Sequence, residues 1–488
     1  MLAQLKMAYR DSLIYSVGNL ANKVVGFILL PLYTSYFDLA EFGVLGLIEP
    51  MVSMLLIVFS MGLNPAFIRW YSTTEEKKQR GEIFFNVYST LVFINLFIVA
   101  FAVVFSDQIS MLLLDTGVYG LILKIAFINV FFNQLNPIMF TAFRVERRPV
   151  QFSLVNFVQF TLTLILNIFF LVYLEFGLLS IFLSQLISSF MVFLYFIPQV
   201  IRHSRFSLRK DLIRQLLVYG IPLIPIGISN LVINMLNRYI LEEFSSRDTV
   251  GLFTFSYRLS NTIKILIIES LTLSLTPVLY SKLSEASDYR FVKKNYVYAC
   301  FIVVLVYIFF ASFGRELVYL VTQREAYYRS YLLLPFLGFV YIIHTLIYFD
   351  NLLLGYAKKT GKMATITLIS ALSSLMFNFA LIPFLDDLGA AIALILSTAI
   401  ILVLTRHAAK KEFGKFYSND KIVKLVFTGT GIVLINFLFF MELGITNFII
   451  KFIICITFPL ILYIVNFYDP IEIETVGSIL RKIRSRFF

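Results

Sequence analysis

The chain has 488 residues, of which 59% are hydrophobic and 14% are charged, and its mean hydropathy is +0.86. A soluble domain carries about 25% charged residues, so this composition excludes an ordinary soluble protein and indicates a polytopic membrane protein. The net charge of +12 does not indicate a nucleic-acid partner, because Lys and Arg gather in short loops where anionic lipid headgroups would meet them.

Fourteen apolar runs are long enough to cross a bilayer, which takes about 20 residues for each helix. The sequence therefore predicts an all-α polytopic membrane protein with fourteen transmembrane helices. In chain order, the expected spans are 11–37, 43–68, 82–106, 119–142, 150–173, 176–201, 214–240, 250–280, 291–313, 328–354, 362–385, 387–407, 421–441 and 445–468. The first run follows a short basic start and is expected to act as its own insertion signal.

Basic loops alternate with acidic or mixed loops along the chain. Arg147 and Arg148, for example, follow the fourth run, whereas Glu175 follows the fifth. The positive-inside rule assigns the basic loops to the cytoplasm. Because the number of spans is even and both ends are basic, we expect a multi-pass protein of the cytoplasmic (inner) membrane with both termini in the cytoplasm. Residues 469–488 are expected to form a basic tail at the membrane surface.

The two halves of the chain repeat each other. A polar stripe in the span 150–173 recurs 211 residues later in the span 362–385: Asn156, Gln159, Thr163 and Asn167 match Thr367, Ser370, Ser374 and Asn378. Six helices in each copy preserve orientation, so the pattern predicts a parallel repeat. The predicted units are an N-lobe (1–201), a C-lobe (202–415) and two additional helices (416–468). We expect the two stripes to join helices within each lobe.

Polar and charged residues inside the spans predict a cavity between the lobes. Charge within a membrane is costly, and it usually faces a cavity or a partner. Three spans carry such residues on one helical face by the 3.6-residue period. The predicted cavity residues are Asn19 and Lys23 in the first span, Asn230, Asn234 and Asn237 in the seventh, and Arg258, Asn261 and Lys264 in the eighth.

This cationic, amide-rich cavity suits an anionic ligand that bears sugars. Lys and Arg pair with phosphate groups, and Asn amides both donate to and accept from hydroxyl groups. A lipid-linked diphosphate oligosaccharide has both parts. Glu49, Glu269 and Asp350 are candidates for coupling transport to an ion, Na⁺ or H⁺, although each is also a candidate counter-ion. In that alternative, Arg258 pairs with Glu269 or Asp350 as a structural contact.

Other charged and reactive residues have simpler interpretations. Arg238 and Lys451 lie near span ends, where snorkelling to the headgroups is the expected explanation. Cys300 and Cys455 lie inside apolar runs, so neither a disulfide nor a metal site is expected. The chain also contains no P-loop and no nucleophile constellation, and we expect no catalytic residues and no cofactor.

The opening of the chain is similar to that of a known family. The resemblance is carried by Ser16-Val17-Gly18-Asn19 with Lys23, by Pro31-Leu32-Tyr33-Thr34 and by Glu41-Phe42-Gly43, which Asp248-Thr249-Val250-Gly251-Leu252-Phe253 echoes. With the six-plus-six repeat, the chain resembles the polysaccharide transporter family of O-antigen-type flippases, in the multidrug/oligosaccharidyl-lipid/polysaccharide (MOP) exporter superfamily.

The resemblance implies a transport function. It implies export of undecaprenyl-diphosphate-linked oligosaccharide across the cytoplasmic membrane by ion-driven alternating access, with membrane lipids and polysaccharide polymerase or export machinery as further partners. Lys23 and Arg258 fall where the family carries cavity-facing basic residues. Three alternatives stay open: a peptidoglycan-precursor flippase, an ion-coupled multidrug antiporter and, from a different class, a membrane glycosyltransferase or ligase.

Overall fold

The computed structural model describes residues 28–272, 275–276, 279, 283, 290–322, 324–414, 419–440, 442–470 and 472–474. Every regular element in these ranges is a helix, which confirms the all-α prediction. Eleven helices are long and apolar enough to cross a membrane, and one of them, α18 (Thr360–Phe413), covers two predicted spans that meet at a kink at Asp386. The count of fourteen stays a prediction, because most of the first run lies outside the described residues.

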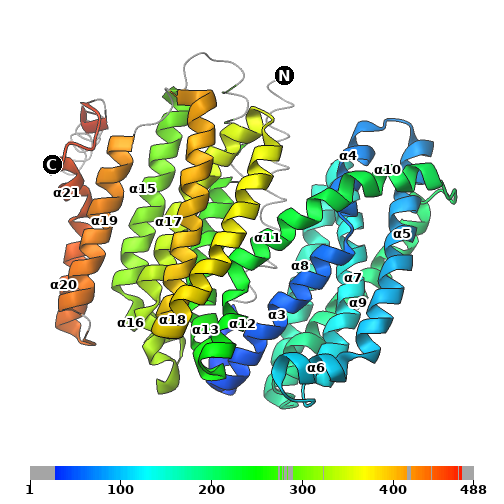
Figure 1. Cartoon of the computed structure of the whole chain (residues 1–488), viewed down its shortest axis with the longest axis horizontal. Coiled ribbons are helices and arrows are strands. Elements are labelled where there is room, and N and C mark those ends of the chain that lie inside the picture. The colour runs from blue at the N-terminus through cyan, green and yellow to red at the C-terminus, as the bar shows by residue number, and fades with distance from the viewer. Residues whose placement is uncertain are drawn as a thin grey trace, which may run out of the picture.

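The first half of the chain forms one group of helices, blue to cyan-green in Figure 1. Its elements are α2 (Leu30–Tyr36), α3 (Leu39–Phe59), α4 (Leu63–Thr73), α5 (Lys77–Val104), α6 (Ser106–Leu114), α7 (Gly120–Val145), α8 (Pro149–Ile168) with the π-turn η1 (Phe169–Tyr173), and α9 (Leu179–His203). Helix α3 begins with a capping box, in which Asp38 accepts from the N–H of Glu41 and Glu41 accepts from the N–H of Asp38.

The second half, green to orange in Figure 1, forms the other group, except that α10 lies beside α4 and α5 of the first half. Its elements are α10 (Lys210–Gly220), η2 (Ile221–Leu223), α11 (Ile224–Met235), α12 (Asn237–Phe244), α13 (Arg247–Ile263), the π-turn η3 (Lys264–Ile268), α15 (Arg290–Ser312), α16 (Gly314–Val321), η4 (Glu325–Leu332), α17 (Leu334–Tyr356) and α18. At the far edge, α19 (Asn419–Phe439), α20 (Ile445–Ile456) and α21 (Phe458–Ile464) form an appendage, of which α19 and α20 contact α15.

The backbone repeats at the offset predicted from the polar stripes. Arg147 and Lys358 lie 211 residues apart, and both have a positive φ, 55° and 57°. Glu175 and Asp386 have the same separation, with φ of 55° and 49°. A positive φ is uncommon for residues other than glycine, and at the first pair it ends a helix in a left-handed cap. Two pairs of residues with this uncommon backbone conformation at the same offset confirm the parallel repeat.

The predicted span 214–240 is not one straight helix. Pro222 and Pro225 lie at its break, where each lacks the N–H that a continuous helix needs. Helix α10, before the break, packs on α4 and α5 of the first half, whereas α11 and α12 pack on α18 of the second. The segment that follows the predicted boundary at residue 202 therefore contacts both halves.

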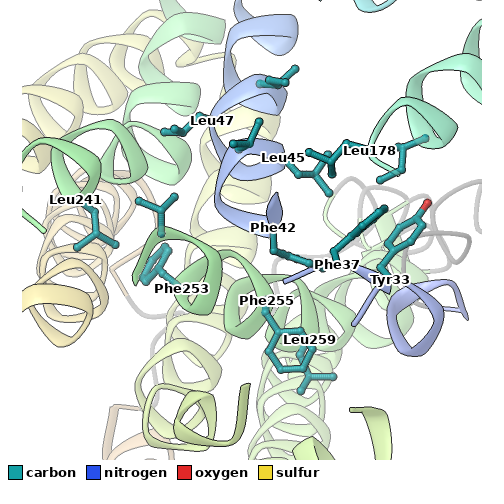
Figure 2. Close-up of a cluster of buried hydrophobic side chains, with 14 of the residues drawn as sticks. Tyr33, Phe37, Phe42, Leu45, Leu47, Leu178, Leu241, Phe253, Phe255 and Leu259 are labelled. Atoms are coloured by element: carbon teal, nitrogen blue, oxygen red, sulfur yellow. The ribbon is translucent and has the colours of Figure 1, made fainter. Parts of the chain in front are cut away.

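The two halves meet at one end, where α3 lies beside α12 and α13. They diverge toward the other end, where α4 and α11 lie (Figure 1). At the junction, Phe42 of α3 packs edge-to-face on Phe255 of α13, with ring centroids 6.2 Å apart. Figure 2 shows Phe42 beside Phe37 and above Phe255 in the same buried cluster. Tyr327 closes the cluster, because its hydroxyl donates to the carbonyl of Phe37 at 3.0 Å.

Candidate functional site

A polar cavity of about 450 Å³ lies next to this junction. Helices α7, α8 and α9 supply most of its wall, and α2, α3 and α13 complete it. Amide side chains dominate the lining, and Arg258 is the one cation that the described residues contribute to it. The polar lining residues are Tyr33, Glu49, Asn129, Asn133, Asn136, Asn156, Gln159, Thr163, Asn167, Gln185, Ser188, Ser189 and Arg258.

Glu49 lies between two arginines. Nη2 of Arg258 donates to Oε1 of Glu49, and Nη1 of Arg238 lies 3.7 Å from Oε2. Arg238 also donates from Nη1 to the carbonyl of Gly46 at 3.2 Å, and its guanidinium lies 5.2 Å from the ring centroid of Tyr257. Two arginines against one carboxylate leave this triad with an excess positive charge, and Arg258 and Glu49 present it to the cavity.

The snorkelling interpretation of Arg238 and Lys451 is wrong. The side chain of Arg238 is 1% exposed, and that of Lys451 is fully buried with its Nζ 2.7 Å from Oε1 of Glu316. Buried charges require such partners, because an unpaired ion in a low-dielectric interior is very costly. Position near a span end does not reveal which neighbouring helix covers the residue.

The seventh-span asparagines lie apart from the cavity lining. The amides of Asn230 and Asn234 each donate to the carbonyl four residues earlier, at 3.1 and 2.7 Å, and both residues are at least partly exposed. Asn237 is buried, and neither of its side-chain polar atoms has a hydrogen-bond partner within the described part of the chain. These asparagines stay candidates for contact with cargo in another conformation.

The remaining predicted substrate residues occupy different surroundings. Oδ1 of Asn261 accepts from the hydroxyl of Tyr341 at 3.3 Å. Lys264 begins the π-turn η3. Asn19 and Lys23 lie outside the described residues, so their roles stay predictions. Of the eight predicted residues, the structure brings Arg258 to the cavity.

The three candidate coupling carboxylates are in unlike environments. Glu49 lines the cavity and pairs with Arg258. The alternative from the sequence had expected Glu269 or Asp350 as the partner of Arg258. Asp350 is fully buried and accepts from Nε of Arg406 at 3.1 and 2.9 Å, while Arg406 also donates to the hydroxyl of Tyr296 at 2.8 Å. Glu269 directly follows η3 and is half-buried.

Several lining residues were not predicted as site residues. Asn129, Asn133 and Asn136 lie on one face of α7, and their i, i+4, i+7 spacing is a signal that could have found them. The stripe on α8 joins helices as expected, since Thr163 donates to Ser188 at 2.7 Å. It also lines the cavity, so the expectation of a purely structural role is too narrow.

Comparisons with known proteins agree with this architecture. Residues 8–284 match a family model described as polysaccharide biosynthesis protein. A Haemophilus influenzae protein of the Lsg locus is 24% identical over 292 residues, which are 57% of this chain and 67% of the relative.

Two groups of solved transporters share the fold. The lipid II flippase MurJ in an inward closed conformation superposes with a TM-score of 0.72 and 15% identity, over 92% of this chain and 99% of that one. An inward-facing multidrug resistance MATE family transporter of the MOP superfamily gives 0.65 and 14%, over 82% and 95%. The family model covers more than half of the sequence. The chain therefore belongs to the polysaccharide biosynthesis protein family and has the fold of MOP-superfamily transporters.

Proposed function

We propose that this protein is a flippase that moves a lipid-diphosphate-linked oligosaccharide, the repeat unit of a surface polysaccharide of the O-antigen type, across the cytoplasmic membrane. The observation that carries the proposal is the cavity beside the junction of the two halves, in which Arg258 stands among amide side chains. Membership of the polysaccharide biosynthesis family supports the same cargo class.

The cavity offers each part of this cargo a suitable partner. A guanidinium can hold a diphosphate through two parallel hydrogen bonds, and Arg258 carries one at the edge of the cavity. The amides of Asn133, Asn156 and Gln159 can donate to and accept from glycan hydroxyl groups. The undecaprenyl chain would stay in the hydrocarbon core of the bilayer, so its movement would not require transfer into water.

Glu49 accepts a hydrogen bond from the same guanidinium that the diphosphate would bind. We expect the diphosphate to replace this carboxylate, because both are anions that accept from the same Nη2. The exchange would reach the junction through Arg238, which contacts both Glu49 and the carbonyl of Gly46. Glu49 is therefore the first candidate for coupling cargo or a cation to the movement of the halves.

The arrangement of the halves supports alternating access. They meet at the end that the charge pattern assigns to the outside and diverge at the end it assigns to the cytoplasm, as in an inward-facing transporter. Rocking about the junction would expose the same cavity to the other side. Both termini would then lie in the cytoplasm.

The alternatives differ in cargo. A peptidoglycan-precursor flippase is supported by the fold shared with MurJ, and its cargo would also carry a lipid diphosphate. A multidrug antiporter is supported only by the fold shared with MATE transporters. The positive triad of Glu49, Arg238 and Arg258 opposes a cationic drug by electrostatic repulsion.

The test is the leaflet distribution of lipid-linked glycan in a strain that lacks the gene. We expect undecaprenyl-linked repeat units to accumulate on the cytoplasmic side and the gene to reverse this, whereas Arg258→Ala should not. Lys424→Ala, which removes a surface pair with Asp420, is the matched control. A trapped peptidoglycan precursor would favour the first alternative, dye efflux the second, and glycan transfer by the purified protein an enzyme.

A further inference from the structure

A second, larger cavity lies at the end of the first half that is predicted to be cytoplasmic. It has a volume of about 1120 Å³ and lies between the α4–α5 connection, the α7–α8 connection and the end of α9, near the labels α4 and α5 in Figure 1. It shares no lining residue with the central cavity. Its charged lining consists of Lys77, Lys78, Arg80, Arg148, Arg202 and Arg205 against Glu75 and Glu146.

Three of these cations are available to a ligand. Arg148 lies 3.0 Å from Glu146, and Arg80 donates to the carbonyl of Thr74. Lys77, Lys78 and Arg202, in contrast, have no carboxylate partner in the part of the chain that the structure describes. Topology alone explains why cytoplasmic loops are basic, but not why three loops gather their cations around one cavity.

Of the two acidic residues that line the cavity, Glu75 is exposed, and Glu146 is already paired. Oε1 of Glu146 accepts from the hydroxyl of Tyr71 at 2.7 Å and lies 3.0 Å from Nε2 of His203. Its side chain is only 16% exposed. Because Glu146 is held by these groups and by Arg148, it does not neutralise Lys77, Lys78 or Arg202.

The wall of the cavity is fixed rather than loose. Residues 203–206, at the start of the segment 203–209 that connects the two halves of the chain, form part of it. The N–H of Arg205 donates to the carbonyl of Gly81 at 3.0 Å. The buried amide of Asn86 donates to the carbonyl of Ser207 at 2.7 Å and accepts from the N–H of Arg209 at 2.8 Å. This part of the wall is thus held in place, and the exposed Lys77, Lys78 and Arg202 line the same cavity from α5 and α9.

We infer that this cavity binds a phosphate-bearing ligand through Lys77, Lys78 and Arg202, independently of the central cavity. Two sources share this chemistry: the headgroup of an anionic phospholipid in the adjoining leaflet and a soluble phosphate compound. Because Arg202 lies near the end of α9 and Lys77 begins α5, an occupant would bridge these two helices of the first half. The inference goes beyond the transport proposal and does not depend on its cargo.

The experiment uses the full-length protein in phosphatidylcholine nanodiscs. Trp70, the single tryptophan, precedes Tyr71 in sequence and packs on Tyr219 with ring centroids 5.4 Å apart, so its fluorescence reports on this region. One arm titrates inorganic diphosphate, with radiolabelled diphosphate in equilibrium dialysis as a second readout. The other arm replaces phosphatidylcholine stepwise with phosphatidylglycerol and measures retained lipid by mass spectrometry.

We expect saturable binding in at least one arm, weakened about tenfold or more in Lys78→Gln/Arg202→Gln. Lys410→Gln/Lys411→Gln, at exposed positions of α18, should bind like the wild type. The diphosphate arm is measured in an Arg258→Gln background, which limits it to this cavity. Binding of diphosphate identifies a soluble ligand, and binding of phosphatidylglycerol alone identifies a headgroup. No saturable binding in either arm, or equal binding by Lys78→Gln/Arg202→Gln, overturns the inference.

Discussion

Gly43 of α3 and Gly251 of α13 face each other where the two halves meet. A Cβ atom on Gly43 would lie 2.3 Å from the carbonyl oxygen of Arg247, and one on Gly251 would lie 1.9 Å from that of Leu39. Gly43 and Gly251 are separated by 208 residues, as are Leu39 and Arg247, so each half presents the same face to the other, as in a two-fold contact between copies. Only glycine permits this approach of two helix backbones.

The first prediction concerns this contact. Gly43→Ala should destabilise the closed junction by about 1–3 kcal/mol, because the added methyl group has no space. Thr34, which is buried and donates to the carbonyl of Val321 at 3.3 Å, should become accessible when the junction opens. Labelling of Thr34→Cys by an impermeant maleimide in intact cells measures the opening. Gly431→Ala, where a Cβ atom meets nothing within 4 Å, is the control, and equal labelling of the two would contradict the prediction.

The second prediction is a reversible lock. A Cβ atom on Gly46 would lie 3.2 Å from Cβ of Thr254, just below the separation of about 3.5–4.5 Å found in disulfides. The double variant Gly46→Cys/Thr254→Cys should therefore form a disulfide that holds the junction closed and stops transport. Reduction should restore transport. Gly46→Ser/Thr254→Ser has similar volume and no thiol, so loss of transport in both variants would mean that packing, not the lock, is responsible.

The sequence predicts the fold well because the governing signals are long. Apolar runs and alternating loop charge extend over the whole chain, and the stripe beginning at Asn156 recurs at the offset that the backbone repeats at Arg147 and Lys358. The break at Pro222 changes only how one span is divided between the halves. These repeated patterns were sufficient to predict each of these features, except how that span is divided between the halves.

The site is less predictable, because it depends on which helix faces which. Helical spacing placed Arg258 on a polar face, but it did not reveal that Glu49, 209 residues away, would be its partner. The burial of Arg238 likewise depends on contact with α3. Asn133 could have been found from its spacing, but not that Asn230 would lie outside the lining of this cavity.

The third prediction separates a structural carboxylate from a coupling one. Asp350→Ala leaves Arg406, whose side chain is only 17% exposed, without its anion and should lower the free energy of unfolding by about 3–5 kcal/mol. The double variant Asp350→Leu/Arg406→Met should recover most of that loss. Thermal unfolding of the detergent-solubilised protein measures both. Asp420→Ala breaks the exposed pair with Lys424 and should cost at most about 1 kcal/mol. Full stability of Asp350→Ala would show that the ion pair is not structural.

The fourth prediction concerns pH at the predicted cytoplasmic face. Burial by itself would raise the pKa of Glu146, but hydrogen bonds from His203 and Tyr71 and the charge of Arg148 outweigh it and lower the pKa. A lowered pKa in the folded state stabilises the fold above the ordinary glutamate pKa of about 4.3, and this contribution is lost as the pH falls through the folded value.

Wild type and Glu146→Gln should therefore differ in melting temperature at pH 7, with the wild type higher, and converge in acid. Melting curves of both proteins from pH 8 to pH 2 measure the difference. Glu75→Gln lines the same cavity at an exposed position and serves as the control. A difference that stays constant down to pH 2 would assign the effect to packing instead of charge.

The fifth prediction concerns Glu49 as the internal competitor of the cargo. Glu49→Gln keeps the shape of the side chain but removes the anion that occupies Arg258. Inorganic diphosphate should then bind the central cavity about tenfold more tightly, as expected when a charge-assisted hydrogen bond no longer has to be broken. Arg258→Gln should weaken binding by a similar factor. Equilibrium dialysis in a Lys78→Gln/Arg202→Gln background limits the measurement to the central cavity.

The double variant Glu49→Gln/Arg258→Gln decides between competition and a separate role. If Glu49 acts by occupying Arg258, the double variant should bind as weakly as Arg258→Gln alone, because the two effects are not additive for residues in contact. Additive effects would mean that Glu49 repels the diphosphate without holding Arg258. Transport by Glu49→Gln should fall although binding improves. After cargo release, Arg258 would have no carboxylate to neutralise it, and an unpaired charge within the membrane makes the return of the carrier costly.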